Sequence, residues 1–290
     1  MKLCQLPVGT KVREPVSGRV FLVAAHDHPG YSGTILWSDR IVRKGCFDGK
    51  EAESTVDRVK RHGCNNYAHS NVHQWLNSSR QDWFEPAHEG DAPPSAKNTR
   101  VFLDKKTREQ KAAFKAENAA NAYDQTPGFL TSFPQSFVDA LVENEIPYVE
   151  YAPDGSCRRA YVRAKFFLLS ADELGLRRFT GVAEGSLMPL FYDFRMRLGF
   201  KEAVASDFNF PGAVTENNTE MGWYYWLRTP HHTDPCLSAH VHWSGYISYH
   251  QCNNSSIGIL PACALKADTT VSEEPDEDLV YDLMLGGAAE

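Results

Sequence analysis

The chain has 290 residues, of which 12% are aromatic and 23% charged, a composition typical of a folded globular protein. Its formal net charge of −7 comes from 37 acidic and 30 basic residues, so the charge balance gives no support for nucleic-acid binding. Met1–Thr10 lacks the apolar core of a signal peptide, and no stretch approaches the ~20 apolar residues of a membrane helix, so we expect neither export nor membrane insertion.

The strand signals begin near the N-terminus. Val12–Val16 and Val20–Val23 flank a short Ser-Gly turn, which predicts a strand pair, and Thr34–Val42 predicts a further strand. Ser70–Asn77 predicts a short helix that begins at a serine cap. Its apolar residues recur at helical spacing and should face the core: Val72, Trp75 and Leu76.

The middle of the chain predicts helices and a hairpin. Thr107–Tyr123 contains strong helix formers but few large apolar residues, as in a surface helix. Ser132–Glu143 predicts a core helix capped by its serine. Tyr148–Tyr151 and Arg158–Val162 flank a Pro-Asp-Gly turn and should form a hairpin.

Phe166–Ser170 predicts a buried strand, and Ala171–Leu176 a short helix after it. No internal repeat occurs, and no Pro/Ser/Gly-rich linker divides the chain. We therefore expect a single α+β domain with mixed antiparallel strands and a few helices.

The segment from Gly222 to Leu265 has apolar ends and a polar middle. Four consecutive aromatics at Trp223–Trp226 fit a half-buried strand, and Ile257–Leu265 predicts a buried strand around Pro261. Between them lie five of the chain's 11 histidines, mixed with Tyr, Asn, Ser and Cys. This pattern is typical of a binding surface carried by a rigid scaffold, and we place that surface at about residues 223–265.

A short hairpin is predicted inside this segment, with its turn at Ser244-Gly245. Strand alternation places one set of side chains on the core: Val241, Trp243 and Ile247. It places the other set in water: His240, His242 and Tyr246.

The acidic residues concentrate at the C-terminus. Residues 267–290 contain eight acids and no Lys or Arg, which leaves 29 acids (37 − 8) against 30 bases in the rest of the chain. The pattern predicts a folded body over residues 1–268 and a solvated acidic tail over residues 269–290, in which Leu279–Met284 is a candidate docking segment.

Chemistry-bearing motifs are scarce. The chain has no phosphate-binding glycine loop, no Gly-x-Ser-x-Gly and no His-Glu-x-x-His, so we expect no catalytic activity and no cofactor. The seven cysteines are irregularly spaced without a Cys-x-x-Cys pair, which favours reduced thiols. A zinc site is the alternative, because imidazole and thiolate ligands gather within seventeen residues: Cys236, His240, His242, His250 and Cys252. Their spacing matches no known zinc-finger pattern, and we expect polar residues of a binding face instead.

Several motifs resemble those of a bacterial and phage domain family of unknown function. They are WLRTP at Trp226–Pro230, V-x-W-S-G at Val241–Gly245, G-I-L-P-A at Gly258–Ala262, YAHSNVHQWLN at Tyr67–Asn77 and KFFLLSADELG at Lys165–Gly175. The resemblance spans roughly residues 6 to 268, and it departs from the family pattern at Leu260, where the family often has Arg. It implies a C-type-lectin-like fold, related to the formylglycine-generating-enzyme domain and to the variable proteins of diversity-generating retroelements.

Such retroelements mutate adenines, and an Asn codon changed only at its adenines yields His, Tyr, Asp, Ser, Thr, Cys or Ile. These residue types dominate the middle of the segment, so the resemblance implies a hypervariable surface. An ordinary, undiversified polar loop region is the other interpretation.

We therefore expect a phage or prophage variable protein that recognises a protein or glycan ligand on a target cell surface. Its expected setting is the virion, near the tail, or the host cytoplasm before assembly, and a homo-oligomer is compatible with it. The expected ligand-binding residues are His231, His232, Asp234, His240, His242, Trp243, Tyr246, Ser248, Tyr249, His250, Asn253 and Asn254. The alternative is an enzyme or zinc-dependent protein that uses the Cys/His group on the same scaffold.

Overall fold

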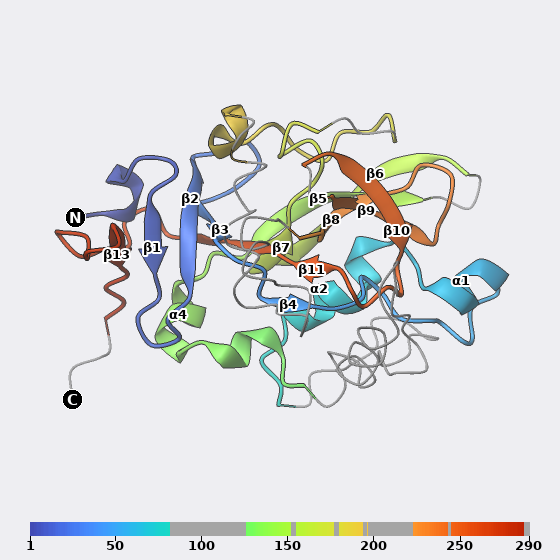
Figure 1. Cartoon of the computed structure of the whole chain (residues 1–290), viewed down its shortest axis with the longest axis horizontal. Coiled ribbons are helices and arrows are strands. Elements are labelled where there is room, and N and C mark those ends of the chain that lie inside the picture. Colours follow the sequence, from blue (N-terminus) through green and yellow to red (C-terminus); the bar gives the residue numbers. More distant parts are fainter. Residues whose placement is uncertain are drawn as a thin grey trace, which may run out of the picture.

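The computed structural model describes residues 1–81, 126–151, 155–176, 180–193, 196, 223–242 and 245–286. Within these ranges the chain forms two larger sheets, a two-stranded hairpin and a few short helices (Figure 1). The expected α+β class is confirmed, because the described strands pair mostly antiparallel; the pairs β1–β13 and β8–β11 are parallel.

The larger sheet has six strands in the order β13-β1-β2-β3-β12-β7. Their bounds are β1 (Lys11–Arg13), β2 (Val20–His26), β3 (Thr34–Ser38), β7 (Phe166–Leu168), β12 (Pro261–Leu265) and β13 (Val280–Asp282). The strand pair predicted near the N-terminus is β1 and β2, and its turn closes when the Gly18 N–H donates to the Glu14 carbonyl at 2.9 Å.

The second sheet has five strands in the order β10-β9-β8-β11-β4. Their bounds are β4 (Arg43–Lys44), β8 (Tyr225–Pro230), β9 (Leu237–Val241), β10 (Ile247–Gln251) and β11 (Gly258–Ile259). The single strand expected around Pro261 is two strands, β11 and β12, and the chain crosses from the five-stranded to the six-stranded sheet at Leu260. The expected hairpin in the middle of the chain forms between β5 (Asn144–Tyr151) and β6 (Cys157–Ala164).

The described helices are short. They are η1 (Leu3–Gln5), α1 (Asp57–His62), η2 (Tyr67–His69), α2 (Asn71–Leu76), η3 (Phe129–Ser132), α4 (Gln135–Ala140) and η4 (Pro189–Tyr192). Helix α2 confirms its prediction, since the Ser70 hydroxyl accepts the His73 N–H at 3.3 Å. Its three predicted apolar residues are buried. Among the described residues, no helix combines the length and apolar character needed to cross a membrane.

Three helix predictions have other outcomes. Helix α4 begins three residues later than expected, because Ser132 lies in η3 and its hydroxyl donates to the Phe129 carbonyl. Ala171–Leu176 forms turns rather than a helix, although Ser170 and Glu173 make the reciprocal contacts of a helix start, and the Glu173 carboxylate is held by a distant arginine. The surface helix expected at Thr107–Tyr123 lies outside the described residues.

Strand β8 is buried on both faces. Trp226 packs into one core cluster, where its indole meets the Phe47 ring at a centroid distance of 5.8 Å. Tyr225 and Leu227 point into the other cluster, which lies on the opposite face of the strand. The aromatic block is therefore scaffold, and it gives the neighbouring strand β9 a central position in the sheet.

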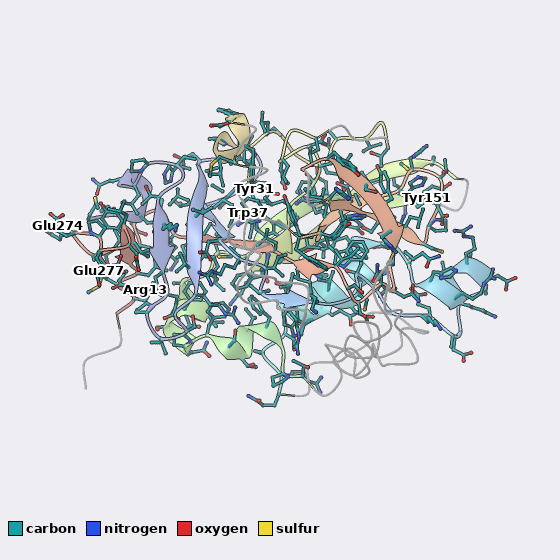
Figure 2. All side chains as sticks on the ribbon, viewed as in Figure 1. Arg13, Tyr31, Trp37, Tyr151, Glu274 and Glu277 are labelled. Atoms are coloured by element: carbon teal, nitrogen blue, oxygen red, sulfur yellow. The ribbon has the colours of Figure 1, made fainter. Side chains whose placement is uncertain are left out.

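The acidic C-terminal segment packs on the body, so the prediction of a solvated tail is wrong for residues 269–286. Strand β13 extends the six-stranded sheet at β1, and Val271, Val280 and Leu283 are buried. Arg13 of β1 bonds Asp276 at 2.9 Å and Asp282 at 2.8 Å, and Figure 2 shows Arg13 beside this segment. The candidate docking segment Leu279–Met284 does dock, because it contains β13.

Truncation after Asp268 should destabilise the protein. Each of the three buried side chains is worth about 1.5–3 kcal/mol, so we expect a loss of at least about 3 kcal/mol after the ordering entropy is subtracted. Urea unfolding followed by circular dichroism measures the loss, with Met284→Ser, at an exposed position of the same segment, as the control. A truncated chain as stable as the parent would show that the segment contributes nothing to folding.

Candidate functional site

The predicted hairpin forms at the edge of the five-stranded sheet, from β9 and β10. Ile247 lies opposite Val241, and Gln251 lies opposite Leu237. The turn closes through the His242 N–H, which donates to the Tyr246 carbonyl at 2.8 Å. Residues 243 and 244 lie outside the described residues, and with them the expected contact residue Trp243.

One face of the hairpin lies on the core, as predicted. Ala239 and Val241 of β9 are fully buried in the cluster that also holds Tyr225. Ile247 and Tyr249 of β10 pack against the same cluster and are half-buried. Tyr249, predicted as a ligand contact, is therefore only partly exposed to solvent.

His240, predicted to face water, is instead buried, with only 3% of its surface exposed. Its ring lies among those of Tyr224, Trp226 and His250, at centroid distances of 5.5, 6.1 and 6.0 Å. The alternation argument assumed a free outer face, but β9 is a central strand whose second face is also covered. Burial lowers the pKa of His240 to about 3, so its ring is neutral, and its Nδ1 has no hydrogen-bond partner in the described part of the chain.

Asn253 and Asn254 are likewise buried, and the prediction that they face a ligand is wrong. The Asn253 side chain donates to the Arg61 carbonyl at 3.2 Å, which ties the loop after β10 to α1. The Asn254 side-chain oxygen accepts the Ser256 N–H at 2.9 Å, and its amide lies 3.1 Å from Nδ1 of His250. Both side-chain N–H groups thus have partners within the protein, Asn253 on α1 and Asn254 on β10. The sequence could not indicate this, because Asn is equally suited to surface turns.

The other expected contact residues keep at least part of their side chains in water: His231, His232, Asp234, His242, Tyr246, Ser248, Tyr249 and His250. At the tip of the hairpin, the rings of His242 and Tyr246 stack at 4.4 Å and 19°. Tyr246 is 55% exposed, and Tyr224 meets His242 edge-on at 4.9 Å. Burial lowers the pKa of His242, so this stack is uncharged at neutral pH.

A second group of rings lies at the start of β9. His231 and His232 lie 4.6 Å apart, and Tyr249 meets His231 edge-on at 4.7 Å. Asp234 is committed to structure, because its carboxylate pairs with Arg58 of α1 and accepts the Cys236 N–H at 3.0 Å.

Tyr224 is a surface residue that the sequence argument assigned to the scaffold. It is half-exposed and lies two residues before Trp226 on the same side of the chain, against both His240 and His242. Strand alternation places it on the same side as the buried Trp226, where it packs against the core cluster, so alternation gave no signal of its partial exposure.

The zinc alternative gains no support from the described residues, in which no three His, Cys, Asp or Glu side chains are grouped so that they could hold a metal ion. Cys236 and Cys252 do face each other across the end of the hairpin, where the Cys252 N–H donates to the Cys236 carbonyl at 2.9 Å. Both are fully buried, and burial raises the pKa of the Cys236 thiol to about 11.

The surface is supported by a buried ion pair between Arg228 of the WLRTP motif and Glu173. The Arg228 guanidinium donates one hydrogen bond to each carboxylate oxygen of Glu173, both at 2.7 Å, and neither side chain is exposed. Burial lowers the pKa of Arg228, but Glu173, Tyr31 and Glu184 together raise it by more, so the guanidinium is charged. Its N–H groups also reach a tyrosine hydroxyl and three carbonyls, at 2.6–3.2 Å: Tyr31, Pro147, Leu168 and Glu184.

A second buried carboxylate, Glu184, adjoins this pair. It accepts the Val149 N–H at 3.1 Å and the hydroxyl of Thr229, the motif's next residue. Burial raises the pKa of Glu184 to about 7, although Arg228 and the two donors oppose the shift. Neither Arg228 nor Thr229 was expected to have a role, and the sequence offered no signal beyond the motif itself.

The raised pKa of Glu184 predicts a pH-dependent loss of stability. Folding favours the protonated carboxyl, so its stabilisation is present below pH 4.5 and is lost as the pH rises through about 7. Glu184→Gln removes the titration, so the stability of the parent relative to this variant should fall by about 3 kcal/mol between pH 4.5 and 8. Urea unfolding of both proteins across this range measures the difference, and other titrating groups cancel. A constant difference would mean that Glu184 titrates normally.

Comparison with known proteins identifies one family. Residues 32–267 match the model of the family described as "Domain of unknown function (DUF6273)". No curated protein and no solved structure matches the chain. Since the match covers most of the chain, from the β2–β3 loop to the end of β12, the protein belongs to the DUF6273 family.

Proposed function

We propose that this protein is a non-catalytic ligand-binding protein that recognises its ligand through the outer part of the β9–β10 hairpin. The proposed surface, here called the ring surface, consists of five residues: Tyr224, His242, Tyr246, Ser248 and His250. The observation that carries the proposal is the stacked His242–Tyr246 pair, which is held at the hairpin tip with more than half of Tyr246 in water.

An exposed ring stack of this kind suits recognition. Tyr supplies a large contact area with few rotatable bonds, and a ring already held by its neighbours loses little further freedom on binding. The imidazoles of His242 and His240 are neutral at pH 7, because burial lowers both pKa values. Ring stacking and hydrogen bonding, rather than a fixed positive charge, should therefore select the ligand.

The small number of residues in the ring surface limits the size of the epitope that it can bind. Five residues are far fewer than the ~20–30 residues per side of a standard protein interface. We therefore expect a small epitope, such as a glycan or a short protein segment on a target cell surface, and a gain in avidity if several copies act together. A homo-oligomer on a phage virion would supply such copies.

The scaffold is proposed to be C-type-lectin-like and its surface to be diversified by a retroelement. The ring-surface residues His242, Tyr246, Ser248 and His250 all belong to the set reachable from Asn codons through adenine changes. The buried positions His240, Asn253 and Asn254 also belong to the set, but free variation there would disturb the packed loop. We therefore confine the proposed variation to the exposed positions. It requires a template copy of these codons and a reverse transcriptase nearby in the genome.

Tyr246→Ala should abolish most of the binding without unfolding the protein. An aromatic anchor at the centre of an interface is worth about 2 kcal/mol or more, so we expect a loss of at least about tenfold in affinity. Binding of fluorescently labelled protein to glycan arrays and to intact bacterial cells measures it. Tyr192→Ala is the matched control, because Tyr192 is a 70% exposed tyrosine in η4, outside the ring surface.

The control should bind as the parent does, and both variants should melt at the parent's temperature. Equal binding by Tyr246→Ala and the parent, on whichever array spot or cell the parent recognises, would exclude the ring surface as the recognition site.

A further inference from the structure

A pocket of about 540 Å³ lies between the β1–β2 turn and the segment that joins β3 to β4. Its size falls in the range of about 300–1,000 Å³ that small-molecule sites occupy. The β1–β2 turn and β10 lie toward opposite ends of the molecule (Figure 1), so the pocket is separate from the ring surface. Its polar lining includes two arginines and two serines, and its apolar lining is mainly Val20, Ile41 and Val42.

Arg19 is the unusual residue of this pocket. Its guanidinium carbon lies over the rings of Phe129 and Phe133, at 5.0 and 5.6 Å from their centroids. Within the described part of the chain the guanidinium pairs with no carboxylate and makes no hydrogen bond, and only the backbone of Arg19 is hydrogen-bonded, to Glu14 and Ser17. Burial alone lowers the pKa of Arg19, which is the signature of a partly desolvated cation without a counter-charge. The two rings fix its plane and leave its N–H edge for another partner.

The other polar groups complement this cation. Arg40, 47% exposed, stands at the rim, where it lies 3.8 Å from Asp39. The Ser38 hydroxyl is buried and has no hydrogen-bond partner among the described residues. Glu14, behind the turn, is occupied because its carboxylate accepts the N–H groups of Val16 and Ser17 at 3.1 and 2.6 Å. Two arginines against the single pocket carboxylate of Asp39 leave a net positive charge.

We propose that this pocket binds a soluble phosphomonoester. The Arg19 guanidinium would donate two N–H groups to two phosphate oxygens, a geometry that its planar fork favours. Arg40 would balance the second negative charge, and Ser38 would donate its hydroxyl. The pocket is larger than a bare phosphate requires, so the organic group of the ester would lie against Ile41 and Val42.

Calorimetric titration of the full chain with phenyl phosphate, in a buffer free of phosphate, tests the site. We expect saturable binding that is tighter than that of inorganic phosphate, because the ring buries apolar surface. Arg19→Gln and Arg40→Gln should each weaken the binding by about tenfold, the value of one charge-assisted contact. Arg163→Gln is the control, because Arg163 is a 73% exposed arginine of β6 outside the pocket, and it should bind as the parent does.

Arg19→Gln also removes the contact with the two phenylalanines, so circular dichroism checks that this variant is folded. If Arg19→Gln does not fold, Arg40→Gln, at a more exposed position, tests the site on its own. Absence of saturable binding, or equal affinity in parent and Arg40→Gln, would overturn the proposal. Equal affinity for inorganic and phenyl phosphate would overturn the assignment of an organic ester. Binding to vesicles of phosphatidylcholine and phosphatidic acid, without a response to phenyl phosphate, would assign the site to a lipid headgroup instead.

Discussion

The buried pair of Arg228 and Glu173 is the interaction on which the arrangement of the strands depends. A fully buried ion pair stabilises a fold only when its remaining donors and acceptors are also satisfied. Arg228 meets this condition, since its N–H groups are distributed over a carboxylate, a tyrosine hydroxyl and backbone carbonyls. These partners come from β5, β7, the β2–β3 loop and the segment after β7, so one side chain of β8 joins elements of both large sheets and the β5–β6 hairpin.

The position of β8 then determines which hairpin residues reach water. Trp226 on one face and Tyr225 on the other anchor the strand in both core clusters. Strand β9 pairs beside it, with a register shift between Trp226 and Pro230. His240 is consequently covered on the second face by the rings of its neighbours. Around this buried ring, the rings of Tyr224, His242, Tyr246 and His250 are partly or mostly exposed to solvent. The proposed recognition surface thus lies where the packed rings around His240 end and the neighbouring side chains become exposed to solvent.

Local patterns in the sequence predicted the elements whose cause is local. Helix α2 followed from a serine cap and helical spacing, and the two hairpins followed from turn residues between alternating segments. The burial of Trp226 followed from the aromatic block. In each case the neighbouring residues are sufficient to determine the structure, so a single sequence contains the signal.

The errors concern residues whose environment is set by distant partners. His240 is buried because β8 and β10 flank β9, and the turns at Ala171–Leu176 form where Glu173 is held by Arg228, 55 positions away. The acidic segment near the C-terminus docks because β1, at the other end of the chain, has a free edge and an arginine. Composition and periodicity do not report such pairings. The pocket around Arg19 was missed for the same reason, since its rings and its two arginines come from separate stretches.

The central claim is that the recognition surface contributes little to folding while the rings and amides beneath it are part of the scaffold. Two triple variants test it most directly: one carries alanine at His242, Tyr246 and Ser248, and the other carries alanine at His240, Asn253 and Asn254. The free energy of unfolding in urea should change by no more than about 1 kcal/mol in the first variant, because exposed substitutions are nearly neutral. In the second it should fall by about 3 kcal/mol or more, because buried polar groups lose their partners. Equal losses in the two variants would contradict the division between surface and scaffold.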